Sequence, residues 1–332
     1  MIISNHNYAK YLPACVEAVL AQSYENIQCI IVDDASTDGS PYVIDEIAQK
    51  NPGLLTHKRP VNGGQNAAVL DGLSRTNGQL VVFLDADDIL LPNAIASHVY
   101  VHNSLRLPVG FTCADMLQID GNTFVSSANQ ALNQFVLGHP KQRFEPRQTL
   151  YETVRRPNEV HKDILANIYL LDDRFRTWAW SATSAMMFRR DALNLWAATP
   201  GLEELRYSTD AFFCYGINAI CGSALIDIPL VGYRIHGKNG FAARLPLNNV
   251  RNYEVSSQAE RSIEALELLL NAAKTNHVFY RGLFWRNKRY RAMLSYFEDC
   301  LYNLRRNNLK DRGLIEWAKL LVKHLSSKTE SR

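Results

Sequence analysis

Three carboxylates within four positions, Asp85, Asp87 and Asp88, form the most chemically suggestive group of residues in this chain. They follow an apolar run, residues 80–84, whose composition is typical of a fully buried parallel strand. In open α/β sheets, ligands bind at the carboxyl ends of such strands. Three like charges in one place repel each other, and a bound divalent cation removes that repulsion. Mg²⁺ or Mn²⁺ prefers carboxylates and ligand phosphates, so Asp85 and Asp87 are predicted to form a metal site.

Asp88 has a second interpretation. We expect a helix to begin just after Pro92, and an acidic or amide side chain before it can cap its first turn. Asp88 or Asn93 would take this role. For Asp88 we favour the structural role over a metal site.

A second acidic pair, Asp33 and Asp34, ends another apolar run, residues 27–32. In a doubly wound sheet this pair would lie beside Asp85 and Asp87 across a ligand crevice. The chain has no G-x-G-x-x-G motif after its first strand and no P-loop, so any phosphate would be held by metal. A receiver domain of some 120 residues also collects aspartates, but it would not explain the later Asp210 and His236.

The elements that must position these residues alternate in type. Strands are expected from residue 2 and at residues 27–32, 54–58 and 80–84, with helices at 8–23, 42–49 and 65–75 between them. This alternation of strands and helices predicts a doubly wound, mainly parallel central sheet with helices on both faces.

The rest of the chain is less regular. We expect a helix to about residue 105, a strand near 109–118, a helix start at 184–191, a helix opening with Asp210 at 207–213, and strands at 224–229 and 230–235. Residues 120–176 lack periodicity and are interpreted as an insertion or mobile lid. From residue 247 the pattern is helical, with breaks near 275–276 and 307–308. We predict one domain over 1–243, with halves 1–105 and 106–243, and a helical C-terminal extension over 244–332.

Composition places the chain among ordinary globular proteins, with 47% hydrophobic and 21% charged residues. We see no transmembrane segment or signal peptide, and the six scattered cysteines are typical of buried thiols in a reducing cytoplasm. The net charge of +3 is unevenly divided. Residues 1–243 carry 19 basic and 24 acidic residues, whereas residues 244–332 carry 17 and 9.

Several blocks in a fixed order make the sequence resemble family 2 glycosyltransferases of the GT-A fold. They are residues 2–8, 21–24, 31–40, 62–64 and 83–88, the last of which matches the D-x-D motif of that family. The resemblance extends to about residue 240, with 120–176 unmatched. D-x-D alone is a weak signal, but ordered blocks at this spacing are specific.

The resemblance implies roles for individual residues. The nucleotide-binding residues would be Ser4, Asn5, His6, Asp34, Asn62, Gln65 and Asp85. The metal, Mg²⁺ or Mn²⁺, would be held by Asp87, Asp85 and His236, the last from a Y-R-x-H-x-x-N segment. Asp210 matches the general base of the family's [E/D]-D block, with Thr209 standing where Glu is common.

The implied reaction is transfer of a sugar from a nucleoside-diphosphate donor, with a UDP-sugar as first choice, to a hydroxyl of a saccharide or lipid-linked acceptor. Configuration would invert, and the setting would be synthesis of a cell-surface polysaccharide or glycolipid. A polyprenyl-phosphate glycosyltransferase is the second enzyme interpretation. A catalytically silent nucleotide-binding partner protein is a third, because Thr209 replaces the first acid of the block.

The basic tail has two interpretations. Residues 279–324 interleave cations with aromatics, which suits an anionic membrane surface and a peripheral location on the inner face. We slightly favour the other interpretation, in which the tail packs on the catalytic domain with Leu314, Trp317, Leu320 and Leu321 in a core. No nucleic acid is expected as a partner.

Overall fold

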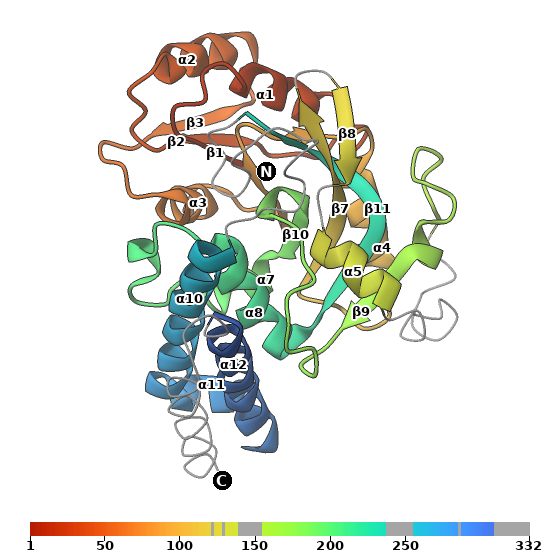
Figure 1. The fold of residues 1–332 in the computed structure, drawn as a ribbon. Coiled ribbons are helices and arrows are strands. Elements are labelled where there is room, and N and C mark those ends of the chain that lie inside the picture. Colours follow the sequence, from red (N-terminus) through yellow and green to blue (C-terminus); the bar gives the residue numbers. More distant parts are fainter. Residues whose placement is uncertain (121–122, 128–129, 139–154, 237–254, 285–286, 309–332) are drawn as a thin grey trace.

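A four-stranded parallel sheet organises the first part of the protein (Figure 1). The computed structural model describes residues 1–120, 123–127, 130–138, 155–236, 255–284 and 287–308. The sheet has the strand order β3-β2-β1-β5, and every pair in it is parallel. Its strands are β1 Ile2–Asn5, β2 Ile30–Asp33, β3 Leu55–Lys58 and β5 Phe83–Asp85. This confirms the predicted parallel sheet.

Helices cover both faces of this sheet, as predicted. Successive strand residues point to opposite faces, so Ile2 and Ile30 enter one hydrophobic cluster whereas Ile3 and Ile31 enter another. The first cluster includes residues of α3 (Gln65–Ser74), and the second includes residues of α1 (Leu12–Leu20) and α2 (Ser40–Lys50). Figure 1 shows α3 on one side of the strands and α1 and α2 on the other.

A second, mixed sheet follows, in the order β4-β10-β7-β11-β6, with β8 paired to β7 and β9 to β11. Only the β7–β11 pair is parallel among the described strands of this sheet. The strands are β4 Leu80–Val81, β6 Ile89–Leu90, β7 Phe111–Asp120, β8 Thr123–Ser127, β9 Ile168–Leu171, β10 Met186–Arg189 and β11 Ser223–Arg234.

The strand predicted at residues 80–84 is divided between the two sheets. β4 pairs antiparallel with β10, and after Val82 the chain continues as β5, which pairs parallel with β1. The carbonyl of Val82 accepts a hydrogen bond from Ile2 N at 2.9 Å. The prediction of one parallel strand was therefore wrong at its beginning, and this segment links the two sheets.

Two further expectations need correction. Residues 186–189 form β10 and not the start of a helix, because they pair with β7; the helix, α7 Arg190–Asn194, begins after them. The two late strands are one, β11, with a register shift around Pro229. Within residues 120–176, β8 pairs with β7 and β9 with β11 of the second sheet; the interpretation of this stretch as an insertion or mobile lid stays a prediction.

The remaining helices are α4 Ala94–Ser104, α5 Gln130–Gly138, α8 Thr209–Cys221, α10 Val255–Thr275, α11 His277–Leu283 and α12 Asn287–Asn308, with short 3₁₀ turns at Ile164–Asn167, Thr183–Ala185 and Leu202–Glu204. The predicted helix break at residues 275–276 is confirmed. Among the described residues, no helix combines the length and apolar character needed to cross a membrane.

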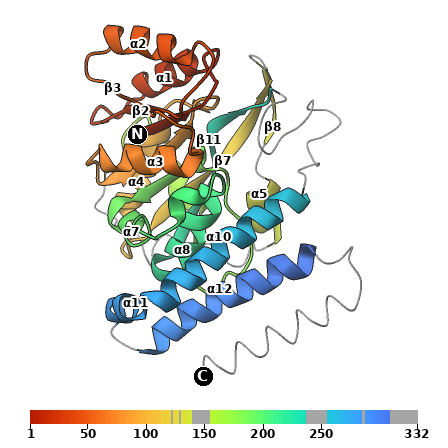
Figure 2. The same ribbon diagram turned by 90° about the vertical axis from the view of Figure 1, so that its left-hand side faces the viewer.

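The C-terminal helices share a hydrophobic cluster with the rest of the fold. α8 lies against α10 and α12, and the side chains of Trp196, Phe212, Leu269 and Phe297 belong to one buried cluster. Figure 2 shows α10 and α12 side by side along the face of α8. Packing on the domain, the interpretation we favoured for the tail, holds for these helices, whereas Leu314, Trp317, Leu320 and Leu321 lie outside the described residues.

Candidate functional site

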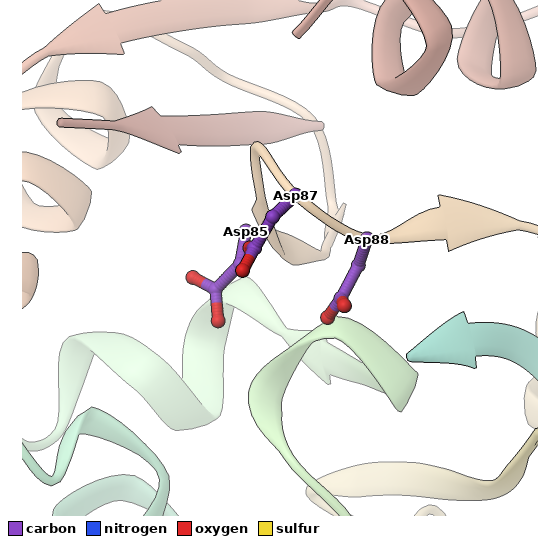
Figure 3. Close-up of side chains that lie close together, drawn as sticks. All are labelled: Asp85, Asp87 and Asp88. Atoms are coloured by element: carbon purple, nitrogen blue, oxygen red, sulfur yellow. The ribbon is translucent and has the colours of Figure 1, made fainter. Parts of the chain in front are cut away.

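The carboxylates Asp85, Asp87 and Asp88 lie together in the turn between β5 and β6, with one oxygen of each within 4.8 Å of the others. Figure 3 shows their side chains projecting to the same side of the turn. Asp87 and Asp88 are buried, and Asp85 is partly buried. The apolar strand before them and the apolar residues of β6 after them fix this turn in the core.

Burial and the repulsion of neighbouring carboxylates raise the pKa values of Asp85 and Asp88. Desolvation, followed by the charge of Asp87, raises the pKa of Asp85 to about 7. Desolvation and the charges of Asp87 and Asp85 raise the pKa of Asp88 well above its usual range. Oδ2 of Asp88 is buried without a hydrogen-bond partner in the described part of the chain. Hard oxygen ligands, crowded negative charge and an unpaired oxygen fit a divalent cation such as Mg²⁺ or Mn²⁺.

Asp88 does not cap the following helix. Its Oδ1 accepts a hydrogen bond at 3.3 Å from the backbone N of Arg234 on β11. Asn93 is the residue at the cap position of α4, and it makes no side-chain cap hydrogen bond. The structural role that we favoured for Asp88 at the helix start is therefore wrong, and the residue joins the acidic cluster.

Asp85 is held in place by two other elements. Its Oδ1 accepts hydrogen bonds from Ser4 Oγ on β1 at 3.1 Å and from Gln65 Nε2 at the start of α3 at 2.6 Å. Gln65 Oε1 in turn accepts a hydrogen bond from Thr209 Oγ1 at 3.1 Å. Thr209 begins α8, so a chain of hydrogen bonds connects the D-x-D turn with the helix that carries Asp210.

Asp87 contacts the end of β11. His236 Nε2 lies 2.8 Å from Asp87 Oδ2, and Arg234 Nε donates to the Asp87 carbonyl at 3.0 Å. The imidazole of His236 stacks on Tyr11 at 4.9 Å, and the guanidinium of Arg234 lies 5.3 Å from the centre of the same ring. A hollow of about 390 Å³ beside these residues is lined by Lys10, Tyr11, Ala14, Asp120, Arg234, Ile235 and His236.

Asp34 is buried and already has several donors. Its carboxylate forms an ion pair with Arg59, and it accepts hydrogen bonds from Gly63 N at 2.9 Å and Gly64 N at 2.7 Å. A carboxylate offers about four acceptor sites, so about one remains for a ligand. The structure thus brings the Asn62-Gly63-Gly64 block onto Asp34, at the same edge as Asp85.

Asn5, His6 and Asn62 lie around Asp34. The Asn5 amide is turned inward and donates to Asp33 Oδ1 at 2.7 Å. His6 is exposed, with Nδ1 2.8 Å from the Asp34 carbonyl, and Asn62 Nδ2 lies 3.2 Å from that same carbonyl oxygen. His6 and Asn62 therefore form the rim of this edge, whereas Asn5 forms its floor.

Asp210 begins α8 next to Thr209. Its Oδ1 accepts a hydrogen bond from Ala211 N at 2.7 Å. Desolvation raises the pKa of Asp210 to about 6, while backbone hydrogen bonds and Arg261 of α10 lower it. The charge of Asp210 also raises the pKa of Asp85. Asp210 and the D-x-D turn therefore share one electrostatic environment, although 125 residues separate Asp85 from Asp210 in the sequence.

Three residues of this site were not predicted: Arg59, Tyr11 and Ser184, whose Oγ accepts from Asp85 N at 3.2 Å. Arg59 follows the end of β3, so its position at a strand end is a signal that could have found it. Tyr11 and Ser184 carry no such signal.

The fold resembles that of solved glycosyltransferases. It aligns with Staphylococcus aureus TarS residues 1–349 at a TM-score of 0.55 and 14% identity, covering 99% of this chain and 79% of that one. The same TarS fragment in complex with UDP-GlcNAc aligns at 0.55 and 16% identity, covering 97% and 79%. The architecture is thus that of the GT-A glycosyltransferases, as predicted.

Within that class, residues 1–145 match the model described as glycosyl transferase family 2. This confirms the family predicted from the motifs, in the part of the chain that carries the strand ends and the D-x-D turn. The match ends before Asp210 and His236, so the roles of those two residues are not covered by it.

Curated relatives agree with this family. An uncharacterized glycosyltransferase of Nostoc sp. is 28% identical over 240 residues, which is 72% of this chain and 65% of the relative. Glycosyltransferase GlyG of Streptococcus pneumoniae is 35% identical over 95 residues, or 29% and 32% of the two chains. Minor teichoic acid biosynthesis protein GgaB of Bacillus subtilis is 36% identical over 92 residues, or 27% and 10%. The matches span less than two thirds of the length of each of these relatives.

Proposed function

We propose that this protein is a metal-dependent, inverting glycosyltransferase. Its donor would be a nucleoside-diphosphate sugar, with a UDP-sugar as first choice, and its acceptor a hydroxyl of a saccharide or a lipid-linked saccharide. The observation that carries the proposal is the hydrogen-bonded chain from Asp85 through Gln65 to Thr209, which joins the D-x-D turn to the helix start of Asp210.

In the proposed reaction, Asp210 accepts the proton of the acceptor hydroxyl as that oxygen attacks the anomeric carbon. A pKa of about 6 leaves this carboxylate ionised at neutral pH and still basic enough for the task. The attack is a single in-line displacement, so configuration inverts. Asp85 and Asp87 would hold Mg²⁺ or Mn²⁺, which supplies charge stabilisation for the departing diphosphate.

The nucleoside would lie along the rim made by His6 and Asn62, over Ser4, Asn5 and Asp34. The remaining acceptor site of Asp34 would receive a base N–H. His236 would stand beside the diphosphate through its contact with Asp87. A role for His236 as a metal ligand requires that this contact open toward the cation.

The setting that we propose is synthesis of a cell-surface polysaccharide or glycolipid in the cytoplasm. The likeness to a teichoic acid biosynthesis protein supports the first part. The six cysteines are free thiols, five of them buried, which supports the second. Domain limits of 1–243 and 244–332 also remain a proposal.

The test compares Asp210→Asn with Asp87→Asn. Asp210→Asn should lower the transfer rate by about 10²–10⁴-fold and leave UDP-sugar affinity within about twofold, because the helix start is retained. Asp87→Asn should instead weaken Mn²⁺-dependent donor binding. Transfer is followed with radiolabelled UDP-sugars, and binding by calorimetry. An equal loss of binding and transfer in Asp210→Asn would rule out the base assignment.

A catalytically silent nucleotide-binding protein is the alternative, and Thr209 at the position of the family's Glu is the observation that favours it. Slow, Mn²⁺-dependent hydrolysis of a UDP-sugar by the wild type, lost in Asp87→Asn, would identify an enzyme. A polyprenyl-phosphate glycosyltransferase would be recognised by transfer to a polyprenyl phosphate in place of a saccharide hydroxyl.

A further inference from the structure

Helix α11 is fixed to the domain by one of its faces. Tyr280 is buried, stacks on Trp196 with 4.7 Å between ring centres, and donates its hydroxyl hydrogen to the Leu195 carbonyl at 3.1 Å. Phe284, four residues further on, packs against the same hydrophobic cluster. This inner face holds α11 in one orientation, so the direction of its outer face is set by the fold.

The outer face of α11 is apolar and exposed. Val278 is 74% exposed, Phe279 51% and Leu283 40%, and the helical spacing of Phe279 and Leu283 puts them on one side. The other large hydrophobic side chains exposed in the described part of the chain lie at separate places, all before residue 208. A group of three such side chains on one short helix marks an interaction surface, whereas scattered single ones do not.

Exposed Arg and Lys side chains lie on α11 itself and at the start of α12. Residues 268–297 contain six Lys and Arg residues and no Asp or Glu, and one of the six, Lys274, pairs with Glu298 at 3.2 Å. Arg281 on α11 and Lys288 and Arg289 at the start of α12 are exposed, and Figure 2 shows α11 beside the start of α12. We call the surface formed by Val278, Phe279, Arg281, Leu283, Lys288 and Arg289 the α11 surface.

We propose that the α11 surface binds an anionic lipid bilayer. Exposed Phe, Leu and Val side chains insert at the boundary of headgroups and acyl chains, and the neighbouring Lys and Arg side chains pair with anionic headgroups. An acidic protein partner would pair with the Lys and Arg side chains but would not explain the exposed apolar side chains. A neutral apolar partner would explain the apolar side chains but not the neighbouring cations. Both views place α11 at the end of the molecule opposite α1 and α2 (Figures 1 and 2), so binding leaves those helices away from the bilayer.

The experiment is co-sedimentation of the full chain with vesicles of phosphatidylcholine alone or with 30% phosphatidylglycerol. Two variants remove the two parts of the surface: Phe279→Ser with Leu283→Ser, and Lys288→Glu with Arg289→Glu. Leu107→Ser and Lys50→Glu are controls that make the same kinds of change at other exposed positions. Circular dichroism and thermal unfolding verify that all variants fold.

We expect the wild type to bind anionic vesicles at least tenfold more than neutral ones, with binding falling as salt rises. Each double variant should lose most of this binding, and both controls should retain it. Wild-type protein that stays in the supernatant, or double variants that bind like the wild type, would overturn the proposal. So would equal binding to neutral vesicles, or a dimer in light scattering that Phe279→Ser with Leu283→Ser converts to a monomer. None of these measurements depends on glycosyl transfer, so the proposed activity can fail without affecting this result.

Discussion

At the scale of single residues, the acidic cluster stores electrostatic strain that a bound cation would relieve. Asp88 is the most informative member, because its carboxylate is buried and one oxygen has no partner among the described residues. Its pKa is raised well above the usual range by desolvation and by Asp87 and Asp85. In the unfolded chain this group would ionise near pH 4.

Asp88→Asn should stabilise the protein in EDTA, increasingly so as pH rises. A carboxyl whose pKa is raised by folding favours the unfolded state once the pH exceeds its unfolded pKa, and that penalty grows until the folded pKa is reached. We expect the unfolding temperature to rise by about 2–4 °C at pH 8 and little at pH 4.5, as measured by scanning calorimetry. Glu17→Gln, at an exposed position on α1, is the control. A gain that is equal at both pH values would contradict this account.

Residue positions were predictable from sequence where a strand end or helix start fixed them. Asp85, Asp87 and Asp210 each follow or open a recognisable element, and the structure brings them together. The residues that hold these carboxylates in place were harder to predict from the sequence. Ser184 and Tyr11 reach the site from loops and turns whose placement depends on tertiary packing, and no periodicity in the sequence reports that placement.

At the scale of elements, the turn before α3 depends on its two glycines. Gly64 has φ = 88°, and a Cβ there would lie 2.5 Å from the Arg206 carbonyl oxygen. Its N–H also donates to Asp34 Oδ2. The turn thus combines a backbone conformation that favours glycine with a close contact to the loop before α8.

Gly64→Ala should therefore destabilise the fold by about 1–3 kcal/mol and weaken donor binding, because the turn must move away from both Arg206 and Asp34. Urea unfolding and calorimetry with UDP measure the two effects. Gly53→Ala is the matched control, since a Cβ at Gly53 meets nothing within 4 Å. A Gly64→Ala protein as stable as Gly53→Ala would show that this turn is not under strain.

The elements that sequence analysis assigned wrongly have a common cause. Residues 186–188 are apolar and fit a buried helix or strand equally well. They form a strand because they pair with β7, more than 65 residues earlier in the chain. The run 80–84 likewise gives no sign that its two ends pair with different sheets. In both cases the deciding contacts are distant in sequence, so local pattern could not supply them.

At the scale of the whole molecule, the C-terminal helices complete the core. Gly216 of α8 lies so close to α10 that a Cβ there would be 2.9 Å from Leu269 Cδ2. Trp196 and Phe297 pack edge to face at 5.7 Å. The C-terminal helices belong to the basic part of the chain, which differs in charge from residues 1–243. Packing therefore joins them to residues 1–243 in spite of that difference.

A protein ending at residue 236 should consequently fail to fold as a soluble monomer, because Trp196, Phe212 and Tyr215 would lose their cover. The same chain ending at residue 308 should remain soluble and unfold cooperatively. Size-exclusion chromatography and binding of a hydrophobic dye compare the two. Cooperative unfolding of the shorter protein would show that the domain limit at 243 is also a folding limit.

The passage of the chain from one sheet to the other at Val82 has a consequence for engineering. Residues 80–90 contribute β4, β5 and β6, which pair with strands from both halves, and the D-x-D turn lies inside this crossing. A hybrid that took residues 106–243 from a relative would have to retain residues 80–90 together with β10 and β11, the strands of the second half that pair with them. Exchange at a loop on either side of residues 80–90 would separate the carboxylates from half of their scaffold.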